Sequence, residues 1–315
     1  MVVKQSPKAF TMRWFNWLVY SSPLIQAPFL LAAAIGLLYA VPKIVADLPE
    51  PLHADTSWEA FTYVAGLWLI LQVSLMLSFG ILITQLMEPR WGEIHFEGEH
   101  FNEYPCFTFM PSMCMHVCAY PAAIVLFAVR PDLAAGTKLS IHMVVGLVGI
   151  MARDFVFLNL DALYLAHHVG AIAVPVLTWG LLQKGPEYDV YFCKCALSLA
   201  WFMVGSAGVD ASKLFHDTPG SHLVYYSLMT LSHVMASYYG IATLIAVNSE
   251  FKPIWGITVL CLVMMYFRQK VAHQEAFAAA SANMCGKHES APQFLSTIKR
   301  RIKNRNPYAG LAFVL

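Results

Sequence analysis

The sequence predicts an all-α polytopic membrane protein with seven or eight transmembrane helices. Hydrophobic residues make up 58% of the 315-residue chain, charged residues make up only 12%, and the mean hydropathy is +0.57. In soluble domains, roughly 25% of the residues are charged. The apolar residues also gather into runs long enough to cross a bilayer, which takes about 20 helical residues.

Eight apolar segments can be marked along the chain. They cover residues 24–45, 58–86, 106–130, 139–159, 162–183, 189–209, 222–247 and 252–269. The stretch from 139 to 183 is too long for one crossing, so we expect it to fold back near Asn159 and Asp161. Pro111 and Pro121 are expected to kink the third segment. The last segment is near the lower length limit, which leaves seven spans as the alternative.

Basic residues lie at both ends of the chain. They occur within residues 1–22 and in a cluster over residues 299–305. The positive-inside tendency then places both termini on the same side of the membrane, which requires an even number of spans. We divide the chain into an amphipathic basic N-terminal segment (1–22), a membrane domain (23–269) and a basic tail (270–315). The tail has a helical pattern to about Asn283 and is expected to lie on the membrane surface or on a protein partner.

The charge and cysteine patterns exclude several classes. The formal net charge is +1 and no basic stripe follows a predicted helix, so nucleic acid is not an expected partner. The seven cysteines lie mostly in apolar stretches, which favours packed thiols over a disulfide framework. Cys114 with Cys118, and the His- and Glu-rich loop 95–100, fit no established metal signature. We expect neither a metal nor a cofactor.

The most informative residues are two adjacent histidines, His167 and His168, in a run that is otherwise almost entirely apolar. Ionisable groups at membrane depth are costly and mark functional sites. Asp154, Asp161 and His168 are spaced by seven, so one continuous helix would place them on one face. If the helix breaks near Asn159, only the histidines remain deep. Because a carboxylate can orient an imidazole as a general base, these two histidines and two aspartates are the candidate catalytic residues. The alternative is that the histidines only form hydrogen bonds across the bundle.

The order of these residues resembles the TLC family, which takes in the translocon-associated membrane protein, the ceramide synthases and a ceroid-lipofuscinosis protein. The resemblance lies in DFVFLNLDALYLAHHVGAIAVPVL followed by VDASKLF, and it covers roughly residues 58–268. It implies a six-helix barrel around a lipid-accessible cavity, with the histidine pair facing inward. Asp210 and Ser212 match the acidic-X-Ser element of the branch outside the synthases.

The resemblance further implies that the protein binds or handles a lipid in this cavity. Asp210, Ser212 and His233 are the expected lipid contacts. Ceramide synthases carry a His-Asp step about twenty residues after the histidine pair, where this chain reads Tyr188-Asp189, so acyl transfer is not expected. The sequence leaves open whether the protein is an enzyme.

The expected location is an integral position in the endoplasmic reticulum membrane, by resemblance to the family. A mitochondrial inner or plastid membrane is the alternative, because the N-terminal segment is basic and free of acidic residues. Membrane lipids are the expected partners. The second functional reading is a non-catalytic accessory or scaffold subunit of a larger membrane complex. Such a subunit would contact other subunits through its N- and C-terminal segments and would hold a structural lipid.

Overall fold

The computed structural model describes residues 15, 17–19, 21–83, 114–131, 136–157, 162–215 and 219–284. Within these residues the regular structure is helical, apart from one isolated bridge between Pro51 and Thr137. The predicted all-α class is therefore confirmed. Long apolar helices also identify the chain as a polytopic membrane protein.

Each predicted apolar segment overlaps one long helix or an α-helix joined to a π-helix. The elements are α2 (Pro23–Asp47), α3 (Trp58–Ser78), η1 (Phe79–Ile83), η3 (Met115–Ala119), α6 (Tyr120–Val129), α8 (Leu139–Phe157), α9 (Ala162–Leu182), η4 (Pro186–Tyr188), α10 (Asp189–Phe215), α11 (Pro219–Val247) and α12 (Pro253–Met284). Five described stretches are long and apolar enough to cross a membrane: Pro23–Asp47, Trp58–Leu82, Leu165–Leu182, Pro186–Ala207 and Tyr226–Val247. The total of seven or eight spans stays a prediction.

Local sequence signals account for several helix boundaries. The long apolar stretch divides as predicted, because α8 ends at Phe157 and α9 begins at Ala162. Ser57 caps α3 by accepting a hydrogen bond from the Ala60 backbone N–H, which satisfies one of the free donors of the first turn. Pro121 has no backbone N–H to donate, and the π-helix η3 lies directly before it. Pro111 lies outside the described residues.

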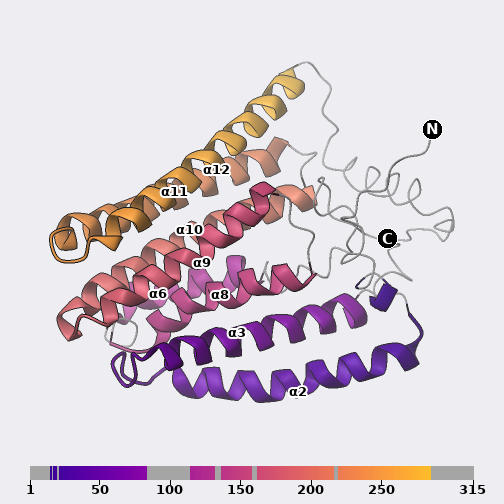
Figure 1. The fold of residues 1–315 in the computed structure, drawn as a ribbon. Helices are drawn as coiled ribbons and strands as arrows, with labels where there is room; N and C mark the ends of the chain where they lie inside the picture. Colours follow the sequence, from indigo (N-terminus) through magenta and orange to yellow (C-terminus); the bar gives the residue numbers. More distant parts are fainter. Residues whose placement is uncertain are drawn as a thin grey trace.

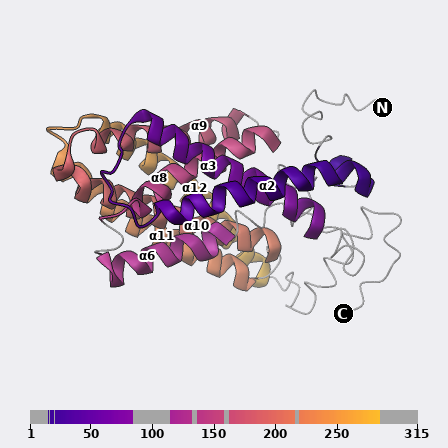
Figure 2. The same cartoon turned by 90° about the horizontal axis from the view of Figure 1, so that it is seen from below.

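The helices form one elongated bundle (Figure 1). Helix α2 packs on α3, which packs on α8, and Figure 2 shows α2 lying across the outer side of this group. Helices α8, α9, α12, α11 and α10 then contact one another in a closed cycle, with α6 against α10. The first turn of α2 and the last turn of α12 lie at one end of the bundle, here called the terminal end (Figure 1). The connections 48–57, 136–138, 183–188 and 248–252 lie at the other end, here called the loop end.

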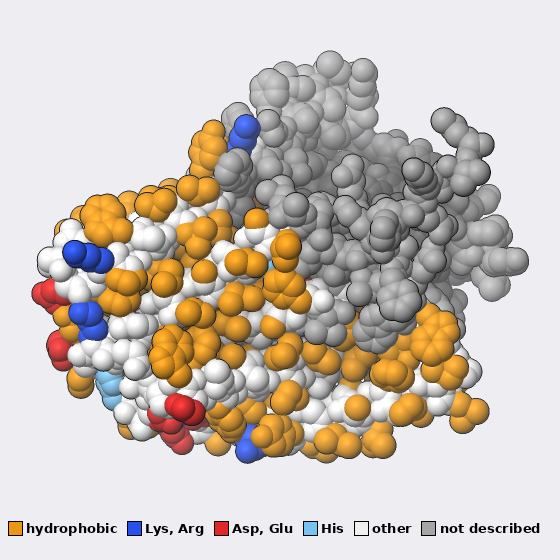
Figure 3. Space-filling model, in the orientation of Figure 1, with side chains coloured by type: hydrophobic (Ala, Val, Ile, Leu, Met, Phe, Trp, Pro, Cys, Tyr) orange, Lys and Arg blue, Asp and Glu red, His pale blue; other side chains and the backbone are white. Residues whose placement is uncertain are grey.

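The surface has the polarity expected of a protein surrounded by lipid. Large apolar side chains on α2 are exposed, including Leu24 at 88%, Leu38 at 77% and Leu31 at 63%. In Figure 3 hydrophobic side chains cover the flanks of the described helices, while the charged side chains visible on this face gather mainly toward the loop end. An apolar surface of this extent has no place in a soluble monomer, and a bilayer supplies its natural solvent.

Charged residues tie the connections of the loop end together. Lys138 Nζ lies 2.8 Å from Asp47 Oδ1 and 2.8 Å from Glu50 Oε2. His142 Nε2 lies 2.9 Å from Asp47 Oδ2, and Trp68 Nε1 donates to His142 Nδ1 at 3.0 Å. Since an indole nitrogen can only donate, Nδ1 of His142 accepts and its Nε2 carries the proton donated to Asp47. This network joins α2, α3 and α8, and it was not predicted from the sequence.

The raised pKa of Lys138 should make the stability of the folded protein depend on pH in the alkaline range. Partial burial acts to lower this pKa, but hydrogen bonds and charge attraction from Asp47 and Glu50 outweigh it and raise the pKa above its ordinary value. The stabilisation is therefore fully present below the ordinary lysine pKa, about 10.4, and is lost as pH rises through the higher folded-state value. We expect Lys138→Met to lower stability by on the order of 1 kcal/mol at pH 8.

The difference between the wild type and Lys138→Met should begin to shrink above about pH 10.4, the ordinary lysine pKa, and continue to shrink as pH rises through the higher folded-state pKa of Lys138. Thermal unfolding midpoints of both proteins, measured from pH 8 to pH 11, test this directly. A difference that stays constant across this range would show that the Lys138 charge contributes nothing to the network.

Candidate functional site

A buried polar cluster joins α3, α8 and α9 within the apolar bundle. His168 Nε2 on α9 lies 2.9 Å from Asp154 Oδ2 on α8. Arg153 donates to the other carboxylate oxygen of Asp154, through Nε at 2.8 Å and also through Nη2. Arg153 Nη1 donates to Gln72 Oε1 on α3 at 3.1 Å. Both oxygens of Asp154 are thus occupied, and one guanidinium connects the carboxylate to a third helix.

All four residues of this cluster are withdrawn from solvent. Arg153 and His168 are 2% exposed, Asp154 is 8% exposed and Gln72 is fully buried. A buried ion is tolerated only when charges and hydrogen bonds compensate its lost solvation, and here the Arg153 and Asp154 charges cancel. The Arg153–Asp154 pair is therefore compensated by opposite charge. Asp154 also holds the His168 ring in one orientation, which is the arrangement that prepares an imidazole for proton transfer.

The structure brings some of the predicted catalytic residues together and separates others. Because α8 ends before residue 158, Asp154 and His168 meet across two helices and do not share the face of one helix. Asp154 is nevertheless buried, which corrects the expectation that a helix break would leave only the histidines deep. His167 is half-buried and packs edge-on against His168, with ring centroids 5.5 Å apart. Asp161 lies outside the described residues.

Arg153 and Gln72 were not predicted as site residues from the sequence. Arg153 carried a usable signal, because a cation next to an aspartate inside an apolar stretch must find a partner at that depth. Gln72 offered little signal, since a single amide in α3 does not reveal which helix it faces.

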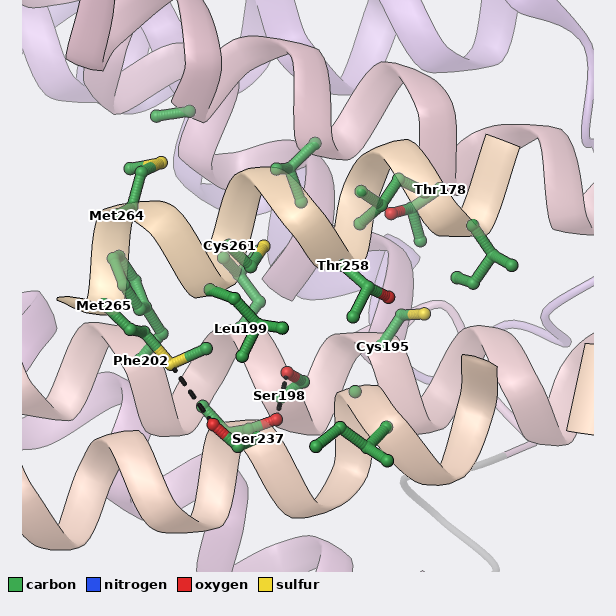
Figure 4. Close-up of a pocket in the computed structure, with 18 of the residues that line it drawn as sticks. Thr178, Cys195, Ser198, Leu199, Phe202, Ser237, Thr258, Cys261, Met264 and Met265 are labelled. Carbon is green, nitrogen blue, oxygen red and sulfur yellow. Dashed lines mark hydrogen bonds between the residues drawn. The ribbon is translucent and has the colours of Figure 1, made fainter. Parts of the chain in front are cut away.

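A separate, largely apolar cavity lies inside the cycle of five helices. Each helix from α8 to α12 contributes to its wall, and its volume is about 50 Å³. Its polar groups are small hydroxyls and thiols, and no charged residue lines it (Figure 4). Those polar lining residues are Thr178, Cys195, Ser198, Ser237, Thr258 and Cys261. A space this narrow fits one slender hydrocarbon segment and excludes the body of a two-chain lipid.

The histidine pair lies beyond one end of this cavity. Neither His167 nor His168 belongs to its lining, although Ala171, one turn further along α9, does. One turn corresponds to about 5 Å along the helix axis. The cluster therefore lies next to the cavity, on the side nearer the terminal end of the bundle. It does not form part of the cavity wall.

His233, a predicted lipid contact, lies toward the same end. Its Nδ1 is 3.0 Å from Gln269 Oε1 on α12, and its ring stacks on Phe202, with centroids 6.1 Å apart. Phe202 lines the cavity and His233 does not, so His233 lies behind the Phe202 ring. Asp210 and Ser212 lie on α10, but their side chains are outside the described part of the chain.

Within the described residues, no group of three or more His, Cys, Asp or Glu side chains is placed to hold a metal ion. Cys114 and Cys118 are exposed free thiols. The His- and Glu-rich loop 95–100 lies outside the described residues.

A larger cavity of about 290 Å³, lined by both charged and apolar residues, lies at the loop end. Asp47, Asp55, Glu59 and Lys138 are among the residues that line it. Asp47 and Lys138 already serve the network that joins α2 to α8, and Asp55 accepts a hydrogen bond from the Ser57 backbone at 2.9 Å. Asp47, Asp55 and Lys138 therefore already have a structural role in the connections of the loop end.

Comparison with known proteins adds no family assignment. No protein-family model, no curated protein and no solved structure matches the chain. The resemblance to the TLC family rests on the sequence motifs alone, and the six-helix barrel and the endoplasmic reticulum location stay predictions.

Proposed function

We propose that the protein binds a membrane lipid by enclosing part of one hydrocarbon chain between α8, α9, α10, α11 and α12. The cavity within this cycle of helices carries the proposal, because its wall is apolar apart from small hydroxyls and thiols. Apolar cavities stay dry and take up apolar ligands, and the surrounding bilayer supplies such ligands at high concentration. The resemblance to the TLC family supports the same function.

The buried cluster gives this lipid site a chemically distinct end. A chain longer than the cavity would extend toward His168 and His233 at the terminal end of the bundle. An imidazole oriented by a carboxylate could then act on a polar group in the part of the ligand that extends beyond the cavity, which is the difference between lipid handling and lipid binding alone. If the protein is an enzyme, His168→Ala should abolish turnover while the bound lipid remains. An accessory subunit would tolerate this change or would lose assembly with its partners.

Filling the cavity should remove the lipid. Ala171 lines the cavity and is 5% exposed, whereas Val169, on the same helix, is 56% exposed. We expect Ala171→Phe to lower the amount of co-purifying lipid by at least about tenfold, because a filled cavity leaves no apolar surface for the chain to bury. Val169→Phe adds a similar side chain on the outside and should leave the lipid in place. Mass spectrometry of extracted lipids measures both.

A variant with a smaller added group keeps the test valid if Ala171→Phe does not fold. An added Cβ at Gly240 would meet the Ser198 hydroxyl oxygen at 3.4 Å, an ordinary contact, so Gly240→Ala should fold and narrow the cavity. We expect an intermediate loss of lipid in this variant. Equal lipid content in the wild type, Gly240→Ala and Ala171→Phe would contradict the proposed function.

A further inference from the structure

One hydroxyl in the cavity wall has no partner. Thr178 is 1% exposed, and its Oγ1 makes no hydrogen bond within the described residues. A helical threonine ordinarily satisfies its hydroxyl by bonding to the carbonyl of the preceding turn. Thr230 and Thr243 of α11 do so, with Tyr226 O at 2.8 Å and Tyr239 O at 2.9 Å. Thr178 departs from this pattern at a position where burial makes an unpaired hydroxyl costly.

Two other hydroxyls of the cavity wall, those of Ser198 and Ser237, are occupied within the protein. Ser198 Oγ donates to the Ala236 carbonyl oxygen at 2.7 Å, and Ser237 Oγ donates to Met265 Sδ at 3.6 Å (Figure 4). These contacts join α10 to α11 and α11 to α12. The hydroxyl of Thr178 is therefore a donor and acceptor that the fold does not use.

The position of Thr178 gives the cavity a direction. Thr178 projects from α9 toward the space bordered by Cys195 and Thr258, while Phe202 and Met265 border the opposite end (Figure 4). Four residues separate Thr178 from the end of α9 at the loop end, a distance of about 6 Å along the axis. His168 lies ten residues away in the other direction, about 15 Å along the same helix.

Building on the lipid-binding function proposed above, we propose that Thr178 Oγ1 hydrogen-bonds an oxygen at one end of the ligand. The ligand is then a single-chain amphiphile that enters with its oxygen toward the loop end and its hydrocarbon toward Phe202 and Met265. No lysine, arginine or histidine lines the cavity, so an ionised carboxylate has no counter-charge there. The oxygen therefore belongs to a neutral group such as an alcohol or an ester carbonyl. It lies at the end opposite the histidine pair.

Two photoreactive probes of equal length test this inference. One is a twelve-carbon alcohol with a diazirine on its chain, and the other is the matching hydrocarbon without the hydroxyl. The full-length protein in phosphatidylcholine nanodiscs is labelled with each probe, and the labelled residues are located by mass spectrometry. We expect wild-type labelling within the cavity to favour the alcohol by about fivefold, the factor that one buried hydrogen bond supplies.

Thr178→Val should remove this preference, because valine keeps the shape of threonine and lacks the hydroxyl. Ser198→Ala is the matched control, since the Ser198 hydroxyl bonds to Ala236 and should not recognise the probe. The Thr178→Val protein should also unfold at a temperature no lower than the wild type when no ligand is added, because it loses an unpaired buried group. That measurement separates lost recognition from lost folding.

The outcomes distinguish this inference from the function on which it rests. If both probes label the cavity equally in the wild type, or if Thr178→Val retains the preference, the Thr178 assignment is wrong and chain binding still stands. If neither probe labels the cavity, the proposed function itself is wrong. Labelling that favours the alcohol in the wild type and in Ser198→Ala, and is equal for both probes in Thr178→Val, supports both.

Discussion

Asp154→Leu is expected to lower the free energy of unfolding by about 3–5 kcal/mol, since it removes the carboxylate that the buried Arg153 contacts through two nitrogens. Arg153 is 2% exposed and directs two of its nitrogens at Asp154. The same change removes the partner of His168 Nε2. Breaking a buried pair costs far more than the pair contributes, because the remaining charge is left uncompensated.

Thermal and denaturant unfolding in detergent micelles near neutral pH measures this effect. The double variant Arg153→Met/Asp154→Leu should recover part of the loss, since it removes the uncompensated charge together with its partner. Asp55→Asn serves as the control, because Asp55 is exposed and accepts a hydrogen bond from the Ser57 backbone. The side-chain oxygen of an asparagine can accept the same bond. A loss for Asp154→Leu no greater than for Asp55→Asn, within about 0.5 kcal/mol, would show that the cluster does not hold the helices together.

Gly149→Ala is expected to cost about 1–3 kcal/mol or more, because α8 approaches the backbone of α3 at this glycine. A Cβ at position 149 would lie 2.5 Å from Trp68 Cβ and 2.6 Å from the Leu69 backbone nitrogen. Backbone atoms cannot move aside as a flexible side chain can, so the two helices must separate. Gln72 lies one turn beyond Trp68 on α3, so the separation should also strain its hydrogen bond with Arg153.

Gly66→Ala is the matched control for this steric effect. An added Cβ at Gly66 would meet nothing within 4 Å, and alanine is the better helix former by up to about 1 kcal/mol. The unfolding midpoint should therefore fall for Gly149→Ala and hold or rise for Gly66→Ala. Gln72→Leu should add less to the loss in the Gly149→Ala background than alone, because both changes act on the same contact. Equal midpoints for the two alanine variants would contradict the close approach of α3 and α8.

The positions of the helices could be predicted from the sequence because span length and hydrophobicity are local properties. The division near residues 158–161 followed from one fact, that about 20 residues cross a bilayer and 139–183 exceeds this length. The end of helix α12 was harder to predict, since its apolar part ends near Tyr266 while the helix continues to Met284. The helical polar pattern of the tail already pointed to that continuation.

The candidate site was only partly predictable. The cost of burying charge marked the histidine pair and Asp154 as residues that need partners. Spacing alone favoured a shared helix face, and the actual contact between Asp154 and His168 runs between two helices. Arg153 and Gln72 entered only through packing, because the rotation of α3 against α8 decides which amide meets the guanidinium.

By itself, the sequence determined that this chain is a bundle of apolar helices with costly polar groups at defined depths, because hydrophobicity and charge act residue by residue. The tertiary structure decided which of those groups meet. It separated the histidine pair from the cavity wall and left Thr178 facing the cavity without a partner. Contacts of this kind depend on the rotation and register of helices distant in sequence, which no local pattern encodes.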